Sequence, residues 1–269
     1  MAVEVSASIG ALYAGMAPDR ACAAAAADGF TAVEFWALAP EEVASAARGV
    51  RSLGLSVTTL NAGTGEGPDS FGLLGIPEAR QEWRRDFCSG IQTARRLGAR
   101  AVNLLVGGRV ATATRSEQLD CVRSNLDWCL QQLGEGDPLL LIEPLNAADR
   151  RSPLIRTVAD ALCVLESVGR PRELGVLFDA YHLHQEEPDV HEAFDKAGPH
   201  VLHIQVADHP GRAEPGSGTL PVLPFLAQVV ASGYDGWVGC EFVPSRSDAV
   251  PAIRASLAAL LRGDVEVAS

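Results

Sequence analysis

Lysine is almost absent from this sequence of 269 residues: Lys196 is the only one, and arginine supplies the remaining cationic side chains apart from histidine. Lys196 lies in a stretch with a helical pattern, ahead of a segment that we expect to be a strand. An enzyme that forms a Schiff base needs a lysine amine beside its substrate. On a barrel of parallel strands, that lysine would stand at the carboxyl end of a strand. The position of Lys196 therefore excludes a Schiff-base aldolase.

Long apolar runs and paired cysteines are missing as well. No apolar run reaches the roughly 18 residues that a membrane-spanning helix needs. The segment Met1-Ala2-Val3-Glu4 has no basic character, so we expect neither a signal nor a transit peptide, and a cytoplasmic protein. The six cysteines are scattered, without CxxC or zinc-finger spacing, and we expect them to be reduced and mostly buried.

Positive charge is in deficit. The sequence has 22 Lys and Arg against 34 Asp and Glu, which gives a formal net charge of −12. Such a charge repels phosphate backbones and anionic lipid, and no local basic patch is visible in the sequence. We therefore expect neither nucleic acid nor a membrane as a partner, and a small molecule as the ligand.

Short β-rich runs alternate with Ala- and Leu-rich helical stretches along the whole chain. This pattern is typical of repeated βα units and a parallel sheet. Several runs are continuously apolar, as in strands that are covered on both faces. The strands that we predict are 3–9, 32–36, 56–62, 101–107, 138–144, 174–179, 201–207 and 237–242.

Helices are predicted to begin near Pro18, Pro40, Pro77, Ser116, Thr157, Pro188, Pro221 and Ala249. Glycines fall where several of them should stop: Gly29, Gly54, Gly98, Gly169 and Gly233. An open doubly wound sheet would want a glycine-rich turn after an early strand, which 9–13 does not provide. The sequence therefore predicts one (β/α)₈ TIM barrel over residues 1–269. Two long connections, 63–76 and 146–156, are expected to be functional elements at the carboxyl ends of the strands.

Three predicted strands end on a bare acidic residue. Glu143 closes an apolar run, Asp179 closes the next, and Glu241 closes the last. The carboxyl ends of barrel strands are where active sites form. Buried carboxylates that converge there need cations, and lysine cannot supply them. A divalent metal ion (Mn²⁺, Mg²⁺ or Co²⁺) can, because such ions take carboxylate and amide oxygens.

The strand between Asp179 and Glu241 offers Gln205 as a fourth ligand, through its side-chain oxygen. His203 shares the face of Gln205 but lies one pleat deeper, where a core or supporting histidine is the more common role. For any single acid the alternative is an N-cap of the following helix or an ion pair with an arginine. An acidic residue recurs at the ends of three strands, and this recurrence favours the metal site over that alternative.

At these residues the chain resembles the hydroxypyruvate isomerase family, within the wider xylose-isomerase-like group of sugar isomerases and epimerases. Weaker similarity extends to 32–35 and 102–107, so that the resemblance covers most of the chain. The blocks that carry it, in order, are 139–146 (Leu-Leu-Leu-Ile-Glu-Pro-Leu-Asn), 178–182 (Phe-Asp-Ala-Tyr-His), 203–208 (His-Ile-Gln-Val-Ala-Asp), 211–218 (Gly-Arg-Ala-Glu-Pro-Gly-Ser-Gly) and 236–241 (Gly-Trp-Val-Gly-Cys-Glu).

The resemblance implies an aldose-ketose isomerase in which one metal ion is held by Glu143, Asp179, Gln205 and Glu241. The two glutamates would also move the proton, one on each side of an enediolate. His182, in the loop that leaves the sixth strand, and Arg212 would hold the substrate oxygens. Glu34, at the end of the second strand, would either contact substrate or support the floor of the site. A structural hydrogen bond is the alternative role of His182.

The chain departs from the family pattern in two loops. The connection after the third strand usually carries a tryptophan and an arginine-glycine pair, whereas here it reads Gly67-Pro68-Asp69-Ser70-Phe71-Gly72. Arginine binds a substrate carboxylate through paired hydrogen bonds. The second altered connection is 146–156, and its Arg150 or Arg151 could replace the arginine that is missing from the first. These departures predict that hydroxypyruvate is not clearly the best substrate.

Other functions use the same residues. A ketose 3-epimerase or a metal-dependent polyol dehydratase needs the same metal and acid-base pair, so these alternatives stay open. A metal-dependent nuclease is disfavoured by the net charge and by too few histidine ligands, and a non-catalytic sugar-binding protein has no need for both glutamates. Analogy with related barrels predicts a homodimer or homotetramer.

Overall fold

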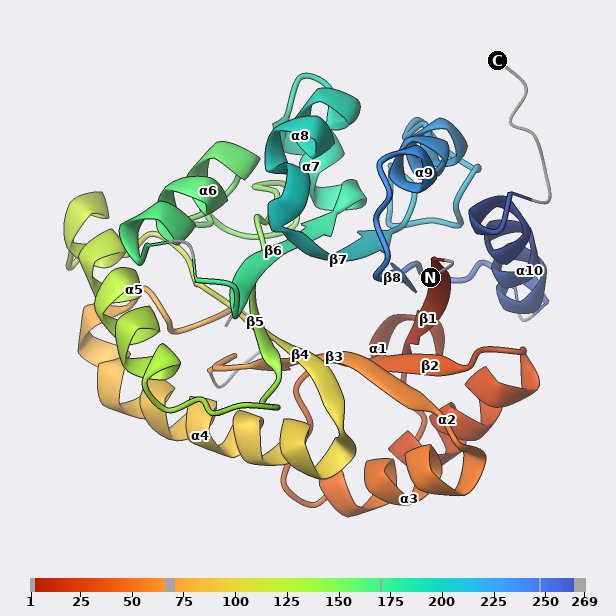
Figure 1. The fold of residues 1–269 in the computed structure, drawn as a ribbon, viewed down its shortest axis with the longest axis horizontal. Helices are drawn as coiled ribbons and strands as arrows, with labels where there is room; N and C mark the ends of the chain where they lie inside the picture. The colour runs from red at the N-terminus through yellow and green to blue at the C-terminus, as the bar shows by residue number, and fades with distance from the viewer. Residues whose placement is uncertain (1–2, 66–70, 170, 247, 264–269) are drawn as a thin grey trace.

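The computed structural model describes residues 3–65, 71–169, 171–246 and 248–263. Within these residues, eight parallel strands close into a barrel, each paired with the next and β8 paired with β1 (Figure 1). The expected (β/α)₈ barrel is thereby confirmed. The strands are β1 (Glu4–Ser8), β2 (Ala32–Phe35), β3 (Ser56–Ala62), β4 (Ala99–Leu104), β5 (Leu139–Ile142), β6 (Leu174–Asp179), β7 (Val201–Val206) and β8 (Trp237–Cys240).

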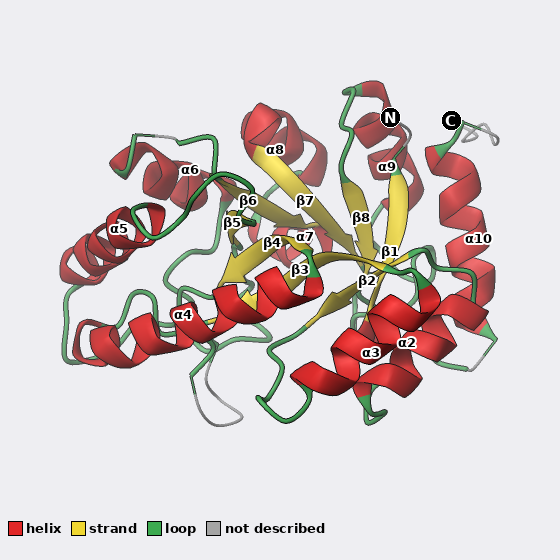
Figure 2. Cartoon of the chain, turned by 60° about the horizontal axis from the view of Figure 1, so that its bottom comes forward, coloured by secondary structure: helices red, strands yellow, loops and turns green. Residues whose placement is uncertain are grey.

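Helices surround the strands (Figures 1 and 2). Two 3₁₀ turns, η1 (Pro77–Ala79) and η2 (Gly198–His200), accompany them. The helices are α1 (Ile9–Leu12), α2 (Pro18–Ala27), α3 (Val43–Leu53), α4 (Arg80–Leu97), α5 (Arg115–Leu130), α6 (Val158–Ser167), α7 (Ala180–Glu186), α8 (Val190–Ala197), α9 (Val222–Ala231) and α10 (Ala249–Leu261).

Local sequence sets the ends of these helices. Thr114 and Thr157 each form a capping box with the acidic residue three positions later, which fixes the starts of α5 and α6. The five glycines that we expected at helix ends all have positive φ, a backbone conformation that glycine adopts without a steric cost. Gly54 and Gly98 are the C-caps of α3 and α4.

The predicted strands were too long at several ends. Residues 105–107 were expected to belong to the fourth strand, but β4 ends at Leu104. The main-chain oxygens of Leu105 and Val106 instead accept hydrogen bonds from Leu74 and Gly75, in the connection after β3. The apolar run therefore continues beyond the barrel ladder and packs under that connection, which an apolar pattern alone does not distinguish from a strand.

Two short helices directly after strands were not predicted. α1 follows β1, and α7 follows β6 where we expected a loop. Asp179 is the N-cap of α7, and its side chain accepts a hydrogen bond from the main-chain N–H of Tyr181. The position of His182 is accordingly corrected: it lies within a helix, which fixes its direction more firmly than a loop does.

The core lies in two places. Most of it fills the space between the barrel and the outer helices, with Trp83, Phe87, Phe178 and Phe225 among the largest fully buried side chains. A smaller apolar cluster, Ala101, Leu141 and Leu177, forms a separate group of buried residues. No helix of the described chain is long and apolar enough to cross a membrane.

Candidate active site at the carboxyl end of the barrel

Strand alternation places the acidic residues over the small apolar cluster. Side chains two positions apart on a strand point to the same face. The cluster is formed by Ala101 on β4, Leu141 on β5 and Leu177 on β6. Two positions further toward the carboxyl end, β4 and β6 carry Asn103 and Asp179, and Glu143 directly follows β5. The apolar cluster therefore continues into a layer of buried polar side chains, and this layer faces the mouth of the barrel.

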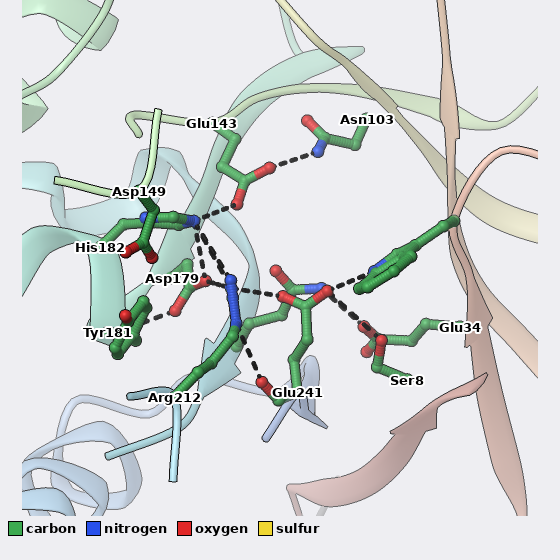
Figure 3. Close-up of polar contacts among 12 residues, drawn as sticks. Ser8, Glu34, Asn103, Glu143, Asp149, Asp179, Tyr181, His182, Arg212 and Glu241 are labelled. Carbon is green, nitrogen blue, oxygen red and sulfur yellow. Dashed lines mark hydrogen bonds and ion pairs between the residues drawn. The ribbon is translucent and has the colours of Figure 1, made fainter. Parts of the chain in front are cut away.

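Three carboxylates and one guanidinium meet in this layer (Figure 3). The guanidinium of Arg212 donates hydrogen bonds to Asp179 and, over 2.8 Å, to Glu241. Glu143 accepts a hydrogen bond of 2.6 Å from the side-chain amide of Asn103. All three carboxylates are buried, and Arg212 pairs with two of them. The sequence left two alternative roles open for such an acid, an N-cap or an arginine partner. Asp179 fills both, because it caps α7 and pairs with Arg212.

Burial and mutual repulsion act strongly on these groups. Burial raises the pKa of Glu143 to about 8, and the nearby charges of Asp179 and Glu241 add to this rise. The pKa of Glu241 is also raised by burial, although Arg212 opposes the shift. Burial acts to lower the pKa of Arg212, but the carboxylates around it outweigh that effect and raise it. Arg212 therefore stays a cation, and the raised pKa values of the two glutamates reflect that one guanidinium does not balance three ionised carboxylates.

His182 is buried beside the same carboxylates. Its Nε2 lies 3.7 Å from Asp179 and 3.9 Å from Glu143. Burial lowers the pKa of His182 to about 4, so the ring is neutral at pH 7. Its Nδ1 accepts a hydrogen bond of 3.2 Å from the main-chain N–H of Asn146. In the neutral ring the proton then lies on Nε2, the nitrogen that faces the carboxylates and the cavity.

Glu34 lies beneath this centre and is tied to the barrel. Its carboxylate accepts hydrogen bonds from Ser6 and, over 2.8 Å, from the side-chain amide of Gln205. His203 places its Nε2 2.8 Å from the same carboxylate. Burial acts to raise the pKa of Glu34, but the charge and hydrogen bonding of His203 outweigh it and lower the pKa. This geometry favours the supporting position for Glu34 and for His203, as against direct contact with a substrate.

Several oxygen and nitrogen donors are close enough to share one cation. Glu143, Asp179 and His182 each offer one atom, and these atoms all lie within 4.8 Å of one another. Glu241 shares the guanidinium of Arg212 with Asp179. Gln205 stands opposite Asp179 in the pairing of β6 with β7, and its amide nitrogen is held by Glu34. Of the predicted ligands, the structure thus groups Glu143 and Asp179 directly, together with His182, whereas Glu241 is linked to them through Arg212 and the amide of Gln205 is held by Glu34.

Sequence reasoning missed two residues that hold the glutamates. Trp36 follows β2, and its indole N–H donates a hydrogen bond of 2.6 Å to Glu241. Asn103 on β4 does the same for Glu143. Asn103 lies in the range 102–107, to which the weaker family similarity extends, and its polar side chain inside an apolar strand was the available signal. Nothing in the sequence singled out Trp36, because the contact depends on how β2, β1 and β8 are arranged by barrel closure.

The loop that carries Arg212 is built around Asp208, which is fully buried. The carboxylate of Asp208 accepts main-chain hydrogen bonds of 2.8–3.0 Å from four residues of the same loop, namely His209, Gly216, Gly218 and Leu220. Asp208 and Ala213 also exchange two main-chain hydrogen bonds, and the main-chain oxygen of Arg212 accepts one from Val243. Arg212 itself has a φ of 56°, a left-handed conformation. The loop therefore fixes the direction of its guanidinium.

A cavity of about 270 Å³ opens over this centre, between the loops that follow the strands. It is of a size for a small metabolite, and its walls combine apolar and charged groups. We call it the inner cavity. Its lining includes Trp36, Asn61, Phe71, Leu105, Glu143, Leu145, Arg150, His182, Arg212 and Glu241.

Fold and site together define a (β/α)₈ barrel protein with a buried acidic centre at its carboxyl mouth, the architecture of barrel enzymes. Comparison with known proteins is more specific. The sequence model of the family described as Xylose isomerase-like TIM barrel matches residues 22–262, so the chain belongs to that family.

Curated relatives confirm the resemblance to hydroxypyruvate isomerases. The chain is 33% identical to hydroxypyruvate isomerase of Escherichia coli K12, over 64% of this chain and 67% of that protein. It is also 33% identical to 2-oxo-tetronate isomerase of Cupriavidus necator, over 82% of this chain and 85% of that protein. The names of these relatives support an isomerase activity for this chain.

The barrel also matches solved structures. A crystal structure of AP endonuclease, family 2, from Brucella melitensis superposes with a TM-score of 0.87 and covers 95% of this chain and 99% of that one. Its sequence identity is 24%, so this likeness bears on the fold alone.

Proposed function

We propose that the protein is a divalent-metal-dependent isomerase of a small hydroxy-carbonyl compound. The observation that carries this proposal is the convergence of Glu143, Asp179 and Glu241 around one guanidinium, with Glu143, Glu241 and Arg212 lining the inner cavity. The isomerase names of the two relatives support the reaction class. Both names refer to small hydroxy-keto acids, which is the substrate class that we propose for this chain.

The donor set fits a divalent cation. Ionised, the three carboxylates leave two negative charges in excess of Arg212, and one Mn²⁺, Mg²⁺ or Co²⁺ ion balances that excess. Carboxylate and amide oxygens are the ligands that such ions prefer, so Glu143, Asp179, Gln205 and Glu241 are the residues that would hold it. A bound ion supplies Lewis-acid polarisation of the substrate carbonyl and lowers the pKa of the carboxyl groups around it.

Glu143 and Glu241 are suited to move the substrate proton. They project from the ends of β5 and β8, on either side of Asp179 and Gln205 in strand order. In the isomerisation, one glutamate removes a proton from the hydroxyl-bearing carbon, the other delivers a proton to the carbonyl carbon, and the hydroxyl proton passes to the former carbonyl oxygen. Asn103 and Trp36 each hold one of these carboxylates by a hydrogen bond of 2.6 Å, so that both have a fixed direction.

His182 and Arg212 are suited to bind the substrate oxygens. The neutral ring of His182 has its proton on Nε2, which makes this nitrogen a donor toward a carbonyl or hydroxyl oxygen and a poor metal ligand in this tautomer. With Asp179 and Glu241 engaged as metal ligands, the guanidinium of Arg212 would be available to hold substrate oxygens. The two side chains approach within 3.5 Å of each other, so they would act on one substrate end.

A substrate screen by proton NMR in D₂O tests this proposal. Hydroxypyruvate, tetronates, tetruloses, pentuloses and hexuloses are each incubated with protein and Mn²⁺. Isomerisation produces a new carbonyl isomer that carries deuterium, a 3-epimerase changes only the stereochemistry, and a dehydratase creates a new chromophore. Protein that binds the metal but never exchanges a substrate proton would contradict the proposal and favour a sugar-binding role.

A further inference from the structure

A second cavity of about 680 Å³ adjoins the inner cavity. We call it the outer cavity. Phe71 and Arg150 line both, so the two spaces meet at these side chains. The outer cavity lies among the loops that follow β4 and β5, and its lining also includes Arg109, Asp149 and Arg151. A substrate held in the inner cavity can therefore extend toward the outer one.

The walls of the outer cavity are braced against each other. The main-chain N–H of Arg109 donates a hydrogen bond of 2.8 Å to Ser152, and Leu154 donates one of 3.0 Å to Gly107. An antiparallel bridge between Gly108 and Pro153 lies between these two bonds. The connections after β4 and β5 thus pair like two short strands. This pairing fixes the backbone from which Arg109 and Arg151 project.

Positive charge is concentrated in this cavity. Three arginines, Arg109, Arg150 and Arg151, line it in a protein whose formal net charge is −12. Among the described residues, none of their guanidinium groups takes part in a hydrogen bond or an ion pair, whereas Arg95, Arg115 and Arg156 all pair with carboxylates.

The one carboxylate in the lining of the outer cavity, Asp149, is already engaged. It accepts a hydrogen bond of 3.2 Å from the side-chain amide of Asn146 and another from Tyr181. These bonds help to keep its pKa below the ordinary value, although burial acts in the opposite direction. Asp149 therefore does not neutralise the arginines through a direct contact, and the cavity keeps an excess of cationic donors.

We infer that the outer cavity binds an anionic group, a carboxylate or a phosphate, at the far end of a substrate longer than hydroxypyruvate. Guanidinium groups recognise both anions through paired hydrogen bonds. Arg150, at the junction of the two cavities, reaches the middle of such a substrate, while Arg109 and Arg151 take its end. This inference rests on the proposed function, because the reacting end of the same molecule occupies the inner cavity.

Two pairs of probes test the inference. Ribulose is compared with ribulose 5-phosphate, and fructose with fructuronate, whose carboxylate lies at the end of the chain far from the ketone, in the presence of Mn²⁺. We expect kcat/KM for at least one charged probe to exceed that of its neutral partner by about tenfold or more, since charge-assisted hydrogen bonds contribute at that level. The pair that shows the difference identifies the phosphate or the carboxylate as the group bound.

The double variant Arg109→Gln/Arg151→Gln is expected to remove most of that advantage. Its matched control, Arg48→Gln/Arg123→Gln, removes the same charge from two exposed ion pairs on the outer helices and should keep the advantage. Equal losses for charged and neutral probes in the first variant, or the same loss of advantage in the control, would overturn the inference.

Calorimetric titration of the charged probes separates this inference from the proposed function, because binding needs no turnover. If no probe reacts but the charged ones bind the Mn²⁺-loaded protein more tightly than their neutral partners, and Arg109→Gln/Arg151→Gln abolishes that preference, the outer site stands while the isomerase proposal fails. If the wild type binds neutral and charged probes equally, the outer site is wrong whatever the activity.

Discussion

The indole N–H of Trp36 donates a hydrogen bond of 2.6 Å to a carboxylate oxygen of Glu241. The two residues are 205 positions apart in the sequence and follow β2 and β8, on either side of β1 in the closed barrel. Trp36 is nevertheless 47% exposed at the mouth of the site. An exposed aromatic ring therefore holds one of the two glutamates to which we assign proton transfer.

Replacing Trp36 by phenylalanine keeps an aromatic ring and removes the donor. We expect kcat/KM to fall by about tenfold, because a hydrogen bond to a charged group contributes roughly 1.5–3 kcal/mol. Trp128→Phe is the control, since Trp128 packs among Trp83 and Phe87 on the outer helices. Glu241 also accepts hydrogen bonds from the hydroxyl of Ser8, over 3.3 Å, and from Arg212, and unchanged kinetics in Trp36→Phe would show that these two orient Glu241 without Trp36.

Metal removal should abolish turnover. We expect about one divalent ion per chain at the oxygen-rich centre, and EDTA-treated protein should lose its activity and regain it with Mn²⁺. Metal content by elemental analysis and activity on the best substrate are measured on the same samples. Full activity in metal-stripped protein with excess EDTA would exclude the metal from the reaction.

Hydroxypyruvate should not be clearly the preferred substrate. The altered connection 63–76, of which residues 66–70 lie outside the described part of the chain, lacks the usual arginine, and the arginine-lined outer cavity is larger than the inner one. Relative kcat/KM values across the substrate screen measure this. A preference for hydroxypyruvate of a hundredfold or more, about 2.7 kcal/mol at roughly 1.4 kcal/mol per decade, would show that the loops do not set the specificity.

Asp208→Asn should weaken the loop that positions Arg212. The carboxylate accepts four main-chain hydrogen bonds, and an amide NH₂ group would face main-chain donors in place of one oxygen. We expect the free energy of unfolding to fall by about 2 kcal/mol, measured by urea denaturation. The exposed Asp248→Asn is the control. Equal stability of Asp208→Asn and wild type would refute this role.

Much of the fold follows from the sequence in physical terms. Alternating strand and helix patterns specify a barrel, and Glu143, Asp179 and Glu241 are conspicuous because a charge that ends an apolar strand is costly without a partner. These residues could be named before their distances were known. Their neighbours could not, because Trp36 meets Glu241 only when β8 pairs with β1 and closes the sheet.

The local errors have physical causes as well. Residues 105–107 were assigned to a strand because their apolar side chains fit one, but their main chain pairs with residues 74–75 instead of with the barrel. Helix α7 was missed because the metal interpretation of Asp179 was favoured over the N-cap alternative, although the same acidic side chain also caps a helix. The outer cavity depends on the pairing of two loops, which no pattern in the sequence reveals.

The central claim is that Glu143 and Glu241 move the proton and do more than hold a metal ion. Replacing either by glutamine keeps an oxygen donor of similar size and removes the base. Metal affinity should fall only moderately, whereas proton transfer should fall by roughly 10²–10⁴-fold. Asp179→Asn is the control: we assign it a ligand role, so that excess Mn²⁺ should recover much of its activity.

Deuterium incorporation from D₂O into the best substrate tests this claim most directly. The wild type should place deuterium on the carbon beside the carbonyl, and Glu143→Gln and Glu241→Gln should each lose most of this exchange while still binding Mn²⁺. If either variant exchanges and turns over at the wild-type rate with metal bound, that glutamate is only a ligand and the two-base mechanism is wrong.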